Sequence, residues 1–152
     1  MGDVDFDDFN WESREYDKFV AYGASKTANI LHTVEADRRL RGLGIRAYAV
    51  HPGTAATSLA RHMSRSDFSQ LRKLAAASAA ARGEPTDGFL DVVTPEQGAA
   101  TQVWAAASPE LAGKGGVYLE DCGVSEAVAP YARDEQRAAD WWILSEKLCD
   151  RA

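Results

Sequence analysis

The stretch GIRAYAVHPG, residues 44–53, decides the fold class of this chain. Residues 45–50 form a short β-prone run, and His51-Pro52-Gly53 ends it. The preceding segment, residues 18–41, contains good helix formers, one glycine and no proline, which predicts a helix. A helix, a tight glycine turn, a strand and a glycine loop are half of a β-α-β unit, so this part of the chain predicts an α/β fold.

The predicted helix over 18–41 has one apolar face. Ala24, Ala28 and Leu31 fall at four- and three-residue spacing, and Ile30 and Val34 widen the stripe. Patterns of the same kind predict the other elements. These are a helix over 57–82 in two pieces with a break near 64–66, a loop over 83–93, a helix over 94–107 that begins with a Thr94-Pro95-Glu96-Gln97 capping box, a strand over 115–119 and a helix over 134–148.

The charge of the chain is concentrated at its start. The 152 residues carry a net charge of −6, with 17 basic and 23 acidic side chains. Residues 1–17 hold seven of the acids and one base, so the rest of the chain is neutral overall. We expect this segment to be an extended acidic lead-in with embedded aromatic residues. No strongly basic surface is expected, which argues against a nucleic-acid partner.

The sequence lacks marks of secretion, membrane insertion or metal binding. Cys122 and Cys149 show no disulfide pattern, the first residues contain no signal segment, and no apolar run approaches the ~20 residues of a membrane span. The three histidines share no ligand spacing, and the run around Asp3, Asp5 and Asp7 lacks the glycine and glutamate of a calcium loop. We expect a cytoplasmic protein with no membrane span and no metal site.

Tyr22 and Lys26 form a Y-x-x-x-K pattern on the first predicted helix. Four-residue spacing places both side chains on one face, one turn apart. Because a neighbouring ammonium favours the phenolate, a tyrosine in this position is suited to proton transfer. The pattern by itself is common, and a half-buried tyrosine beside a solvated lysine is the alternative interpretation.

The second candidate is the loop after the strand, Val50-His51-Pro52-Gly53-Thr54-Ala55-Ala56-Thr57. A glycine after a strand lets the backbone approach a ligand closely, and Thr57 offers a hydroxyl at the start of the next helix. A plain strand-to-helix turn with Thr57 as N-cap is the alternative interpretation.

Together these motifs resemble the C-terminal half of a short-chain dehydrogenase/reductase, in particular the retinol-dehydrogenase-like and WW-domain-oxidoreductase-like branch. The resemblance extends over essentially the whole chain in the order of the family. Its segments are DFDDFNWE (5–12), AYGASKTANIL (21–31), GIRAYAVHPGTAATSLARHM (44–63), TPEQGAATQVWAA (94–106), GVYLEDC (116–122) and WWILSEKL (141–148).

The resemblance implies a fold and a set of site residues. The fold is α/β and partial Rossmann-like, the C-terminal half of a doubly wound parallel sheet, helix-rich with two short parallel strands. Tyr22 corresponds to the catalytic acid/base of the family, and Lys26 to the lysine that tunes it and binds the nicotinamide ribose. The residues that hold the nicotinamide end of NAD or NADP correspond to Pro52, Gly53, Thr54 and Thr57.

Other parts of the family pattern are absent from the sequence. The glycine-rich T-G-x-x-x-G-x-G turn that seats the pyrophosphate has no counterpart, since Gly113, Gly115 and Gly116 come late and precede a strand. The N-A-G segment, the helix with the catalytic asparagine and the strand with the catalytic serine are missing too. We therefore expect 1–152 to be one partial domain, with 1–17 as lead-in and 18–152 as the C-terminal half, and the NAD or NADP site to be incomplete.

A two-stranded parallel sheet is not stable by itself, so a complementary N-terminal-half chain or a homodimer is the expected partner. The first functional hypothesis is an NAD(P)-dependent oxidoreductase subunit that acts on a carbonyl or alcohol. The alternatives are a truncated homologue with a non-redox role (dehydratase, isomerase or cyclase), a non-catalytic scaffold subunit, and a gene or expression fragment without its own activity. The alanine-rich segment before Thr94 allows a small apolar substrate.

Overall fold

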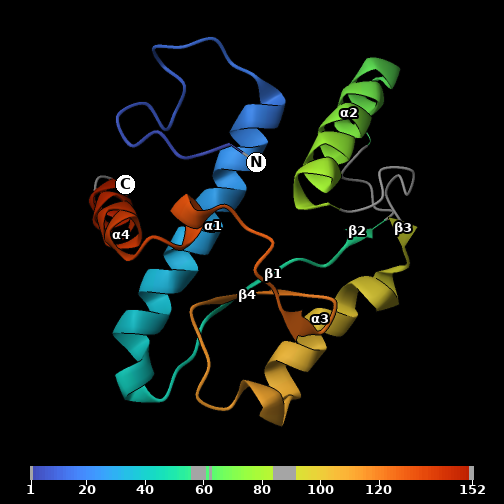
Figure 1. Ribbon diagram of the computed structural model, residues 1–152. Coiled ribbons are helices and arrows are strands. Elements are labelled where there is room, and N and C mark those ends of the chain that lie inside the picture. Colours follow the sequence, from blue (N-terminus) through green and yellow to red (C-terminus); the bar gives the residue numbers. More distant parts are fainter. Residues whose placement is uncertain (1, 56–60, 62, 84–91, 151–152) are drawn as a thin grey trace.

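Helix α1 is the longest element, and the other helices and the strands are arranged around it (Figure 1). The computed structural model describes residues 2–55, 61, 63–83 and 92–150. Its α-helices are α1 (Lys18–Leu40), α2 (Arg65–Arg82), α3 (Pro95–Ala107) and α4 (Glu135–Cys149). Its strands are β1 (Tyr48–Val50), β2 (Thr54–Ala55), β3 (Val92–Val93), β4 (Val117–Glu120) and β5 (Gly123–Val124). Its 3-10 turns are η1 (Arg41–Leu43), η3 (Pro109–Leu111) and η4 (Pro130–Arg133).

The helix boundaries follow start signals that are visible in the sequence. The Asp17 carboxylate accepts the first N–H groups of α1, and Thr94 and Gln97 form the predicted capping box at α3. The helices predicted over 18–41, 94–107 and 134–148 are confirmed to within one residue at each end. No helix within the described ranges is both long and apolar enough to cross a bilayer.

The main sheet has the order β1-β4-β5. β1 and β4 run parallel, with Tyr48 opposite Val117, which confirms the two predicted parallel strands. The prediction is incomplete, because β5 pairs antiparallel with β4 through a turn in which Asp121 and Cys122 have positive φ, and β2 and β3 form a separate parallel pair. Strands of two residues show no alternation that a sequence pattern could detect.

β1 begins at Tyr48 and not at Ile45, because Arg46 and Ala47 are hydrogen-bonded to Asp37 of α1. The Arg46 guanidinium donates to the two Asp37 carboxylate oxygens at 2.8 and 3.0 Å, and the Ala47 N–H donates to Oδ1 at 3.2 Å. Asp37 is buried near the end of α1. This segment is therefore tied to the helix and joins the sheet only three residues later.

Helices cover both faces of the sheet (Figure 1). Ala49 of β1 and Tyr118 of β4 pack on the α1 side, in a cluster with Ile30. Tyr48 and Val50 point to the other side, where they line a groove with residues of α3. This cover on both faces is what parallel strands require, and it agrees with the predicted part of a doubly wound sheet.

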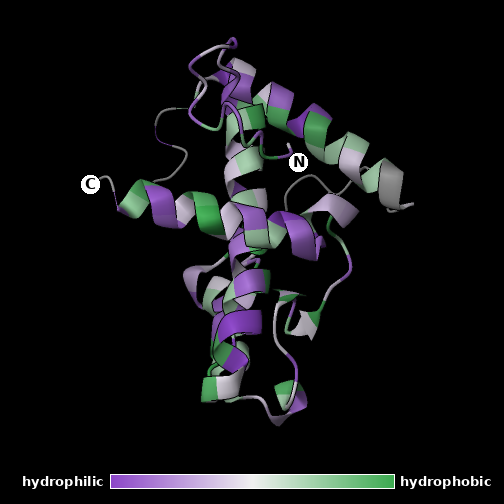
Figure 2. Ribbon diagram, turned by 90° about the vertical axis from the view of Figure 1, so that its left-hand side faces the viewer, coloured by the Kyte–Doolittle hydropathy of each residue, from purple (hydrophilic) through white to green (hydrophobic). Residues whose placement is uncertain are grey.

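The acidic segment before α1 packs between α1 and α4 through its apolar side chains. Val4 is buried against Leu31 and Ala138, which are both 0% exposed. The Phe6 ring stacks on the Trp141 ring with centroids 5.9 Å apart. Figure 2 shows α4 crossing α1, and the lead-in fills the angle between them. The predicted extended lead-in is therefore part of a core cluster.

α2 is joined to the start of α1 by an ion pair. Ser64 and Asp67 form a capping box at its N-terminus, which agrees with the predicted helix break near 64–66. The Lys18 ammonium binds Asp67 and, with a hydrogen bond from the Ser64 N–H, lowers the pKa of Asp67 to about 2. The first piece of the predicted helix, 57–63, lies mostly outside the described residues.

Two buried carboxylates near the end of α1 accept hydrogen bonds from arginines. Glu35 is 0% exposed and binds Arg38 at 2.7 and 2.6 Å and Arg39 at 2.6 Å. The Arg38 hydrogen bonds lower the pKa of Glu35, and the Arg46 hydrogen bonds lower that of Asp37, although burial acts in the opposite direction at both sites. Both groups therefore stabilise the fold in their ionised form.

We expect the free energy of unfolding to fall as the pH is lowered from about 5 toward 3. Because the pKa values of Glu35 and Asp37 are lower in the folded state, their stabilisation is complete above the ordinary carboxyl range and is lost as the pH falls through the folded values. Urea denaturation followed by tryptophan fluorescence measures this profile. Asp37→Asn should lose about 2 kcal/mol at neutral pH and show a shallower pH dependence. Parallel profiles for parent and variant would contradict this assignment.

Gly115 is predicted to be sensitive to a single added methyl group. Its Cβ would overlap Asp37 Oδ1 and lie 2.5 Å from Arg46 Nη2, so Gly115→Ala must displace the ion pair. We expect a loss of about 2 kcal/mol in the same denaturation experiment. Gly42→Ala is the matched control, because its Cβ meets nothing within 4 Å, and its stability should change by less than about 0.5 kcal/mol. Equal losses in both variants would show that the pair is not the cause.

Candidate active site

Tyr22 and Lys26 lie on the face of α1 that points away from the core. Gly23, Thr27 and Leu31 lie on the buried face, where Thr27 bonds to the lead-in and Leu31 packs against the lead-in and α4. Tyr22 is 53% exposed, and Lys26 is exposed one turn later. The burial of one helix face thus determines that this pair faces outward.

The structure brings the two predicted catalytic side chains together. Lys26 Nζ lies 5.0 Å from the centroid of the Tyr22 ring. The Ser25 hydroxyl donates to the backbone oxygen of Tyr22 at 2.7 Å, so Ser25 serves the helix backbone and does not extend toward the phenol oxygen. The pair is therefore an ammonium beside an accessible phenol, which is the arrangement that the Y-x-x-x-K spacing predicts.

The lead-in covers the buried face of α1 directly behind this pair. Thr27 Oγ1 donates to the backbone oxygen of Gly2 at 2.8 Å. A Cβ at Gly2 would lie 2.7 Å from the Val20 backbone oxygen, so this backbone approaches the helix as closely as glycine allows. The lead-in therefore fixes the rotation of the first turns of α1 and leaves the Tyr22 face open.

The loop after β1 is held by backbone contacts and by one imidazole. The His51 N–H donates to the Leu119 oxygen at 2.8 Å, and the Gly53 N–H donates to His51 Nδ1 at 3.0 Å. Gly53 has φ 78°, and a Cβ there would lie 3.2 Å from Val93 Cγ2. Both the backbone angle and the close approach of Val93 thus favour glycine at this position.

The loop and the Tyr22–Lys26 pair lie at the same end of the molecule. α1 and β1 are joined by a short turn and pack antiparallel, so the start of the helix lies on the side where the strand ends (Figure 1). In open α/β sheets, ligands bind outside the carboxyl ends of the parallel strands. The start of α1 and the loop after β1 thus lie toward the same end of the molecule.

The structure places two of the three remaining predicted site residues. Pro52 is exposed in the loop, and Thr54 is half-buried in β2, where it pairs with Val92 of β3. Thr57 lies outside the described residues. The structure also brings Glu120 of β4 to 3.7 Å from His51 Nδ1, a contact that the sequence analysis missed because the two residues belong to distant segments.

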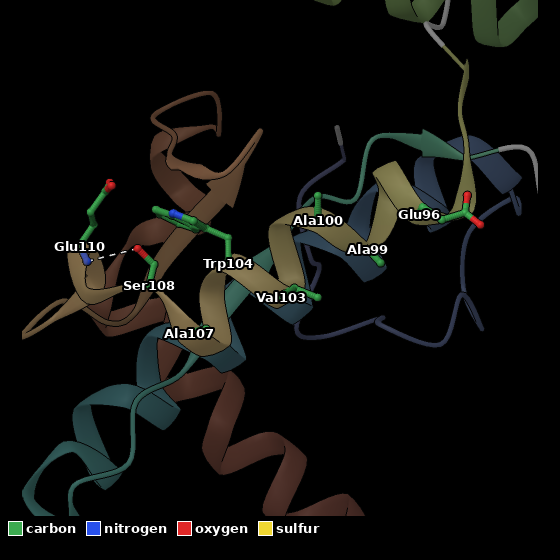
Figure 3. Close-up of a pocket in the computed structure, with 8 residues that line it drawn as sticks. All are labelled: Glu96, Ala99, Ala100, Val103, Trp104, Ala107, Ser108 and Glu110. Atoms are coloured by element: carbon green, nitrogen blue, oxygen red, sulfur yellow. Dashed lines mark hydrogen bonds between the residues drawn. The ribbon is translucent and has the colours of Figure 1, made fainter.

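An open groove of about 550 Å³ lies along α3 and carries no comparable chemistry (Figure 3). It is lined by small apolar side chains and Trp104, and its polar members are Glu96, Ser108 and Glu110. The Ser108 hydroxyl already accepts the Glu110 N–H at 3.2 Å. Because α3 covers the face of the sheet opposite to α1, this groove is separate from the Tyr22–Lys26 pair. Among the described residues, no group of three His, Cys, Asp or Glu side chains is placed to hold a metal ion.

The donor set fits one end of a nicotinamide dinucleotide. A phenol, an ammonium and a glycine loop offer hydrogen bonds and close backbone approach, which suit a ribose and a carboxamide. The set does not fit the pyrophosphate, because the sequence has no glycine-rich turn between a strand and a helix N-terminus. These residue types would suit the nicotinamide end of such a cofactor.

Several known proteins are similar to nearly the whole length of this chain. Retinol dehydrogenase 13 of Homo sapiens is 38% identical over 152 residues, which cover 97% of this chain and 41% of that protein. A short-chain dehydrogenase/reductase of Penicillium rubens is 35% identical over 160 residues, covering 99% of this chain and 44% of that protein. A crystal structure of an uncharacterized protein from Mycobacterium paratuberculosis matches with a TM-score of 0.59 and 30% identity, over 97% of this chain and 45% of that one. No protein-family model matches the sequence.

These similarities cover nearly all of the chain, and they agree with the order of motifs along it. The chain spans about two fifths of the length of the curated relatives that it matches. The structural neighbour extends the similarity from sequence to fold. The chain therefore belongs to the short-chain dehydrogenase/reductase family and corresponds to a part of the length of its members.

Proposed function

We propose that this chain is the part of an NAD(P)-dependent oxidoreductase that carries its proton-transfer residues, and that it acts on a carbonyl or alcohol. The observation that carries the proposal is the exposed Tyr22–Lys26 pair at the end of the sheet where β1 ends. The matched relatives are named as dehydrogenases or reductases, which supports an oxidoreductase role.

Tyr22 is proposed as the acid/base. In the direction of reduction its phenol O–H donates a proton to the carbonyl oxygen of the substrate, and in oxidation the phenolate accepts the proton of the alcohol. Its 53% exposure leaves the hydroxyl accessible to a substrate oxygen. A nicotinamide ring bound beside it would exchange the hydride with the substrate carbon.

Lys26 is proposed to assist Tyr22 and to hold the cofactor ribose. The Lys26 ammonium lies 5.0 Å from the centroid of the Tyr22 ring, which places a positive charge beside the proposed acid/base. The three N–H donors of Lys26 also suit ribose hydroxyls. Both roles need the four-residue spacing, because it keeps the ammonium within one helical turn of the phenol.

The loop after β1 is proposed to hold the nicotinamide end. Pro52 and Thr54 flank Gly53, whose missing side chain leaves the backbone approachable. Thr57, three residues after Thr54 in the sequence, is proposed to add a hydroxyl. We propose no pyrophosphate contact within this chain, because its sequence contains no glycine-rich turn for one.

A complementary N-terminal portion is the proposed partner. Within the described residues, β1 pairs with β4 on one side only, so its other edge is unpaired there and is the proposed place for another parallel strand. The chain also spans only 41% of retinol dehydrogenase 13. A second copy of this chain is the alternative partner, and a small apolar carbonyl or alcohol is the proposed substrate.

Replacing the proposed acid/base tests the catalytic assignment. In an assembly of this chain with its complementary portion, Tyr22→Phe should lower the rate of NADPH-dependent carbonyl reduction about 10³-fold, because the phenyl ring cannot transfer a proton. Tyr16→Phe is the matched control, since Tyr16 is also exposed, at 65%, and its ring contacts Trp11 and not Lys26. An unchanged rate in Tyr22→Phe would favour a scaffold subunit, and product formation without nicotinamide would favour a non-redox enzyme.

Dinucleotide binding tests the need for a partner. We expect the chain alone to bind no NADPH, and binding to appear when the N-terminal portion of a relative is added. Native mass spectrometry measures bound nucleotide, partner chain and self-association in the same spectrum. Stable NADPH binding by the chain alone would show that the missing pyrophosphate site is supplied in some other way and would contradict the proposed division of the site.

A further inference from the structure

Two groups compete for one nitrogen atom beside the candidate site. His51 Nδ1 accepts the backbone N–H of Gly53 at 3.0 Å. The same nitrogen lies 3.7 Å from Glu120 Oε1 of β4. The contact with Gly53 is a hydrogen bond. The contact with Glu120 is close enough for an ion pair but too long for a hydrogen bond.

These two contacts require opposite protonation states of the imidazole. Nδ1 can accept the Gly53 N–H only while it carries a lone pair, which assigns the proton of the neutral ring to Nε2. Once Nδ1 is protonated it becomes a donor, so it can no longer accept from Gly53 and instead bonds to a carboxylate. The presence or absence of one proton on Nδ1 therefore decides which of the two partners His51 binds.

The surrounding structure keeps both partners in place. The His51 backbone N–H is fixed on the Leu119 oxygen at 2.8 Å, which sets the imidazole beside the next residue of β4, Glu120. The Ser125 hydroxyl donates to Glu120 Oε2 at 3.1 Å and leaves Oε1 toward His51. The titratable groups that face the imidazole from β4 are Glu120 and Tyr118, whose ring centroid lies 6.4 Å from that of His51. The His51 side chain is 44% exposed, so its protons exchange freely with water.

We propose that His51 is a positioning residue for the Pro52-Gly53 loop, which it holds through the Gly53 N–H in its neutral form and releases toward Glu120 when it is protonated. The effect on the cofactor rests on the proposed function, because only there does the loop hold the nicotinamide end. Gly53 depends on this bond more than another residue would, since a glycine has the widest backbone freedom and here takes φ 78°. Dinucleotide binding is therefore expected to weaken as His51 becomes protonated.

Nuclear magnetic resonance of the uniformly 15N-labelled chain tests the proposal without any cofactor. Long-range ring spectra report which His51 nitrogen is protonated, and the amide proton of Gly53 reports its hydrogen bond. We expect the Nε2–H tautomer at pH 8 and an upfield shift of the Gly53 amide proton as the pH falls, with the same midpoint as the His51 ring. A Gly53 amide that does not follow His51, or that follows His32 on the far side of α1, would overturn the proposal.

Three substitutions test separately the bond between His51 and Gly53 and the contact between His51 and Glu120. His51→Asn supplies a side-chain oxygen that accepts the N–H two residues later without titrating, so Gly53 should stay bonded at every pH. His51→Leu should leave the Gly53 amide unbonded at every pH. Glu120→Gln removes the carboxylate charge but not the bond of the neutral ring, so the Gly53 amide should stay bonded at pH 8 as in the parent. The Ala47 amide, bonded to Asp37, reports that each variant is folded.

A second measurement tests the consequence for the cofactor in the assembly that binds dinucleotide. The dissociation constant for NADH should rise about fivefold between pH 8 and pH 5.5 in the parent, and this dependence should vanish in His51→Asn. A parent and a His51→Asn variant with identical pH profiles would contradict the role of His51 in cofactor binding. If no variant binds dinucleotide at any pH, the proposed function fails, and the Gly53 amide alone decides the protonation-dependent contact.

Discussion

The packing of one face of α1 against two separate clusters is the constraint on which the rest of the structure depends. Ile30 belongs to the cluster that includes Tyr118 of the sheet, and Leu31 belongs to the one that includes α4 and the lead-in. Successive helix residues are rotated by about 100° about the axis, so the two clusters lie side by side around the helix. If α1 turned about its axis, the side chains in one of the clusters would lose their contacts. The packing therefore fixes the orientation of α1 in which Tyr22 and Lys26 face outward.

A second constraint acts at the far end of the same helix and is electrostatic. Asp37, Arg46 and the Ala47 N–H join the end of α1 to the segment before β1, and Gly115 lets the start of β4 pass beside them. The register of β1 against β4 follows from this joint. The joint thus ties the segment before β1 to the end of α1 that lies away from Tyr22 and Lys26.

The candidate site shows clearly which features a sequence can reveal. Tyr22 and Lys26 could be predicted because four-residue spacing is a local property of a helix, and the glycine loop because it follows a recognisable strand. The contact between His51 and Glu120 could not, since β1 and β4 become neighbours only through the parallel pairing of distant segments. The sequence predicts an extended lead-in, and only the structure shows that its Phe6 ring stacks on Trp141, which lies near the other end of the chain.

The sequence by itself determined three of the helices, the capping box of α3, the two parallel strands and the residue types of the candidate site, because these depend on periodicity and on short-range hydrogen bonds. The tertiary structure alone decided where β1 begins, how the lead-in packs and which partner the His51 nitrogen binds. The physical reason is the same in each case. The buried Asp37 carboxylate, the Phe6 ring on Trp141 and the His51 nitrogen all interact with groups that are distant in sequence. These interactions form only once the chain has folded.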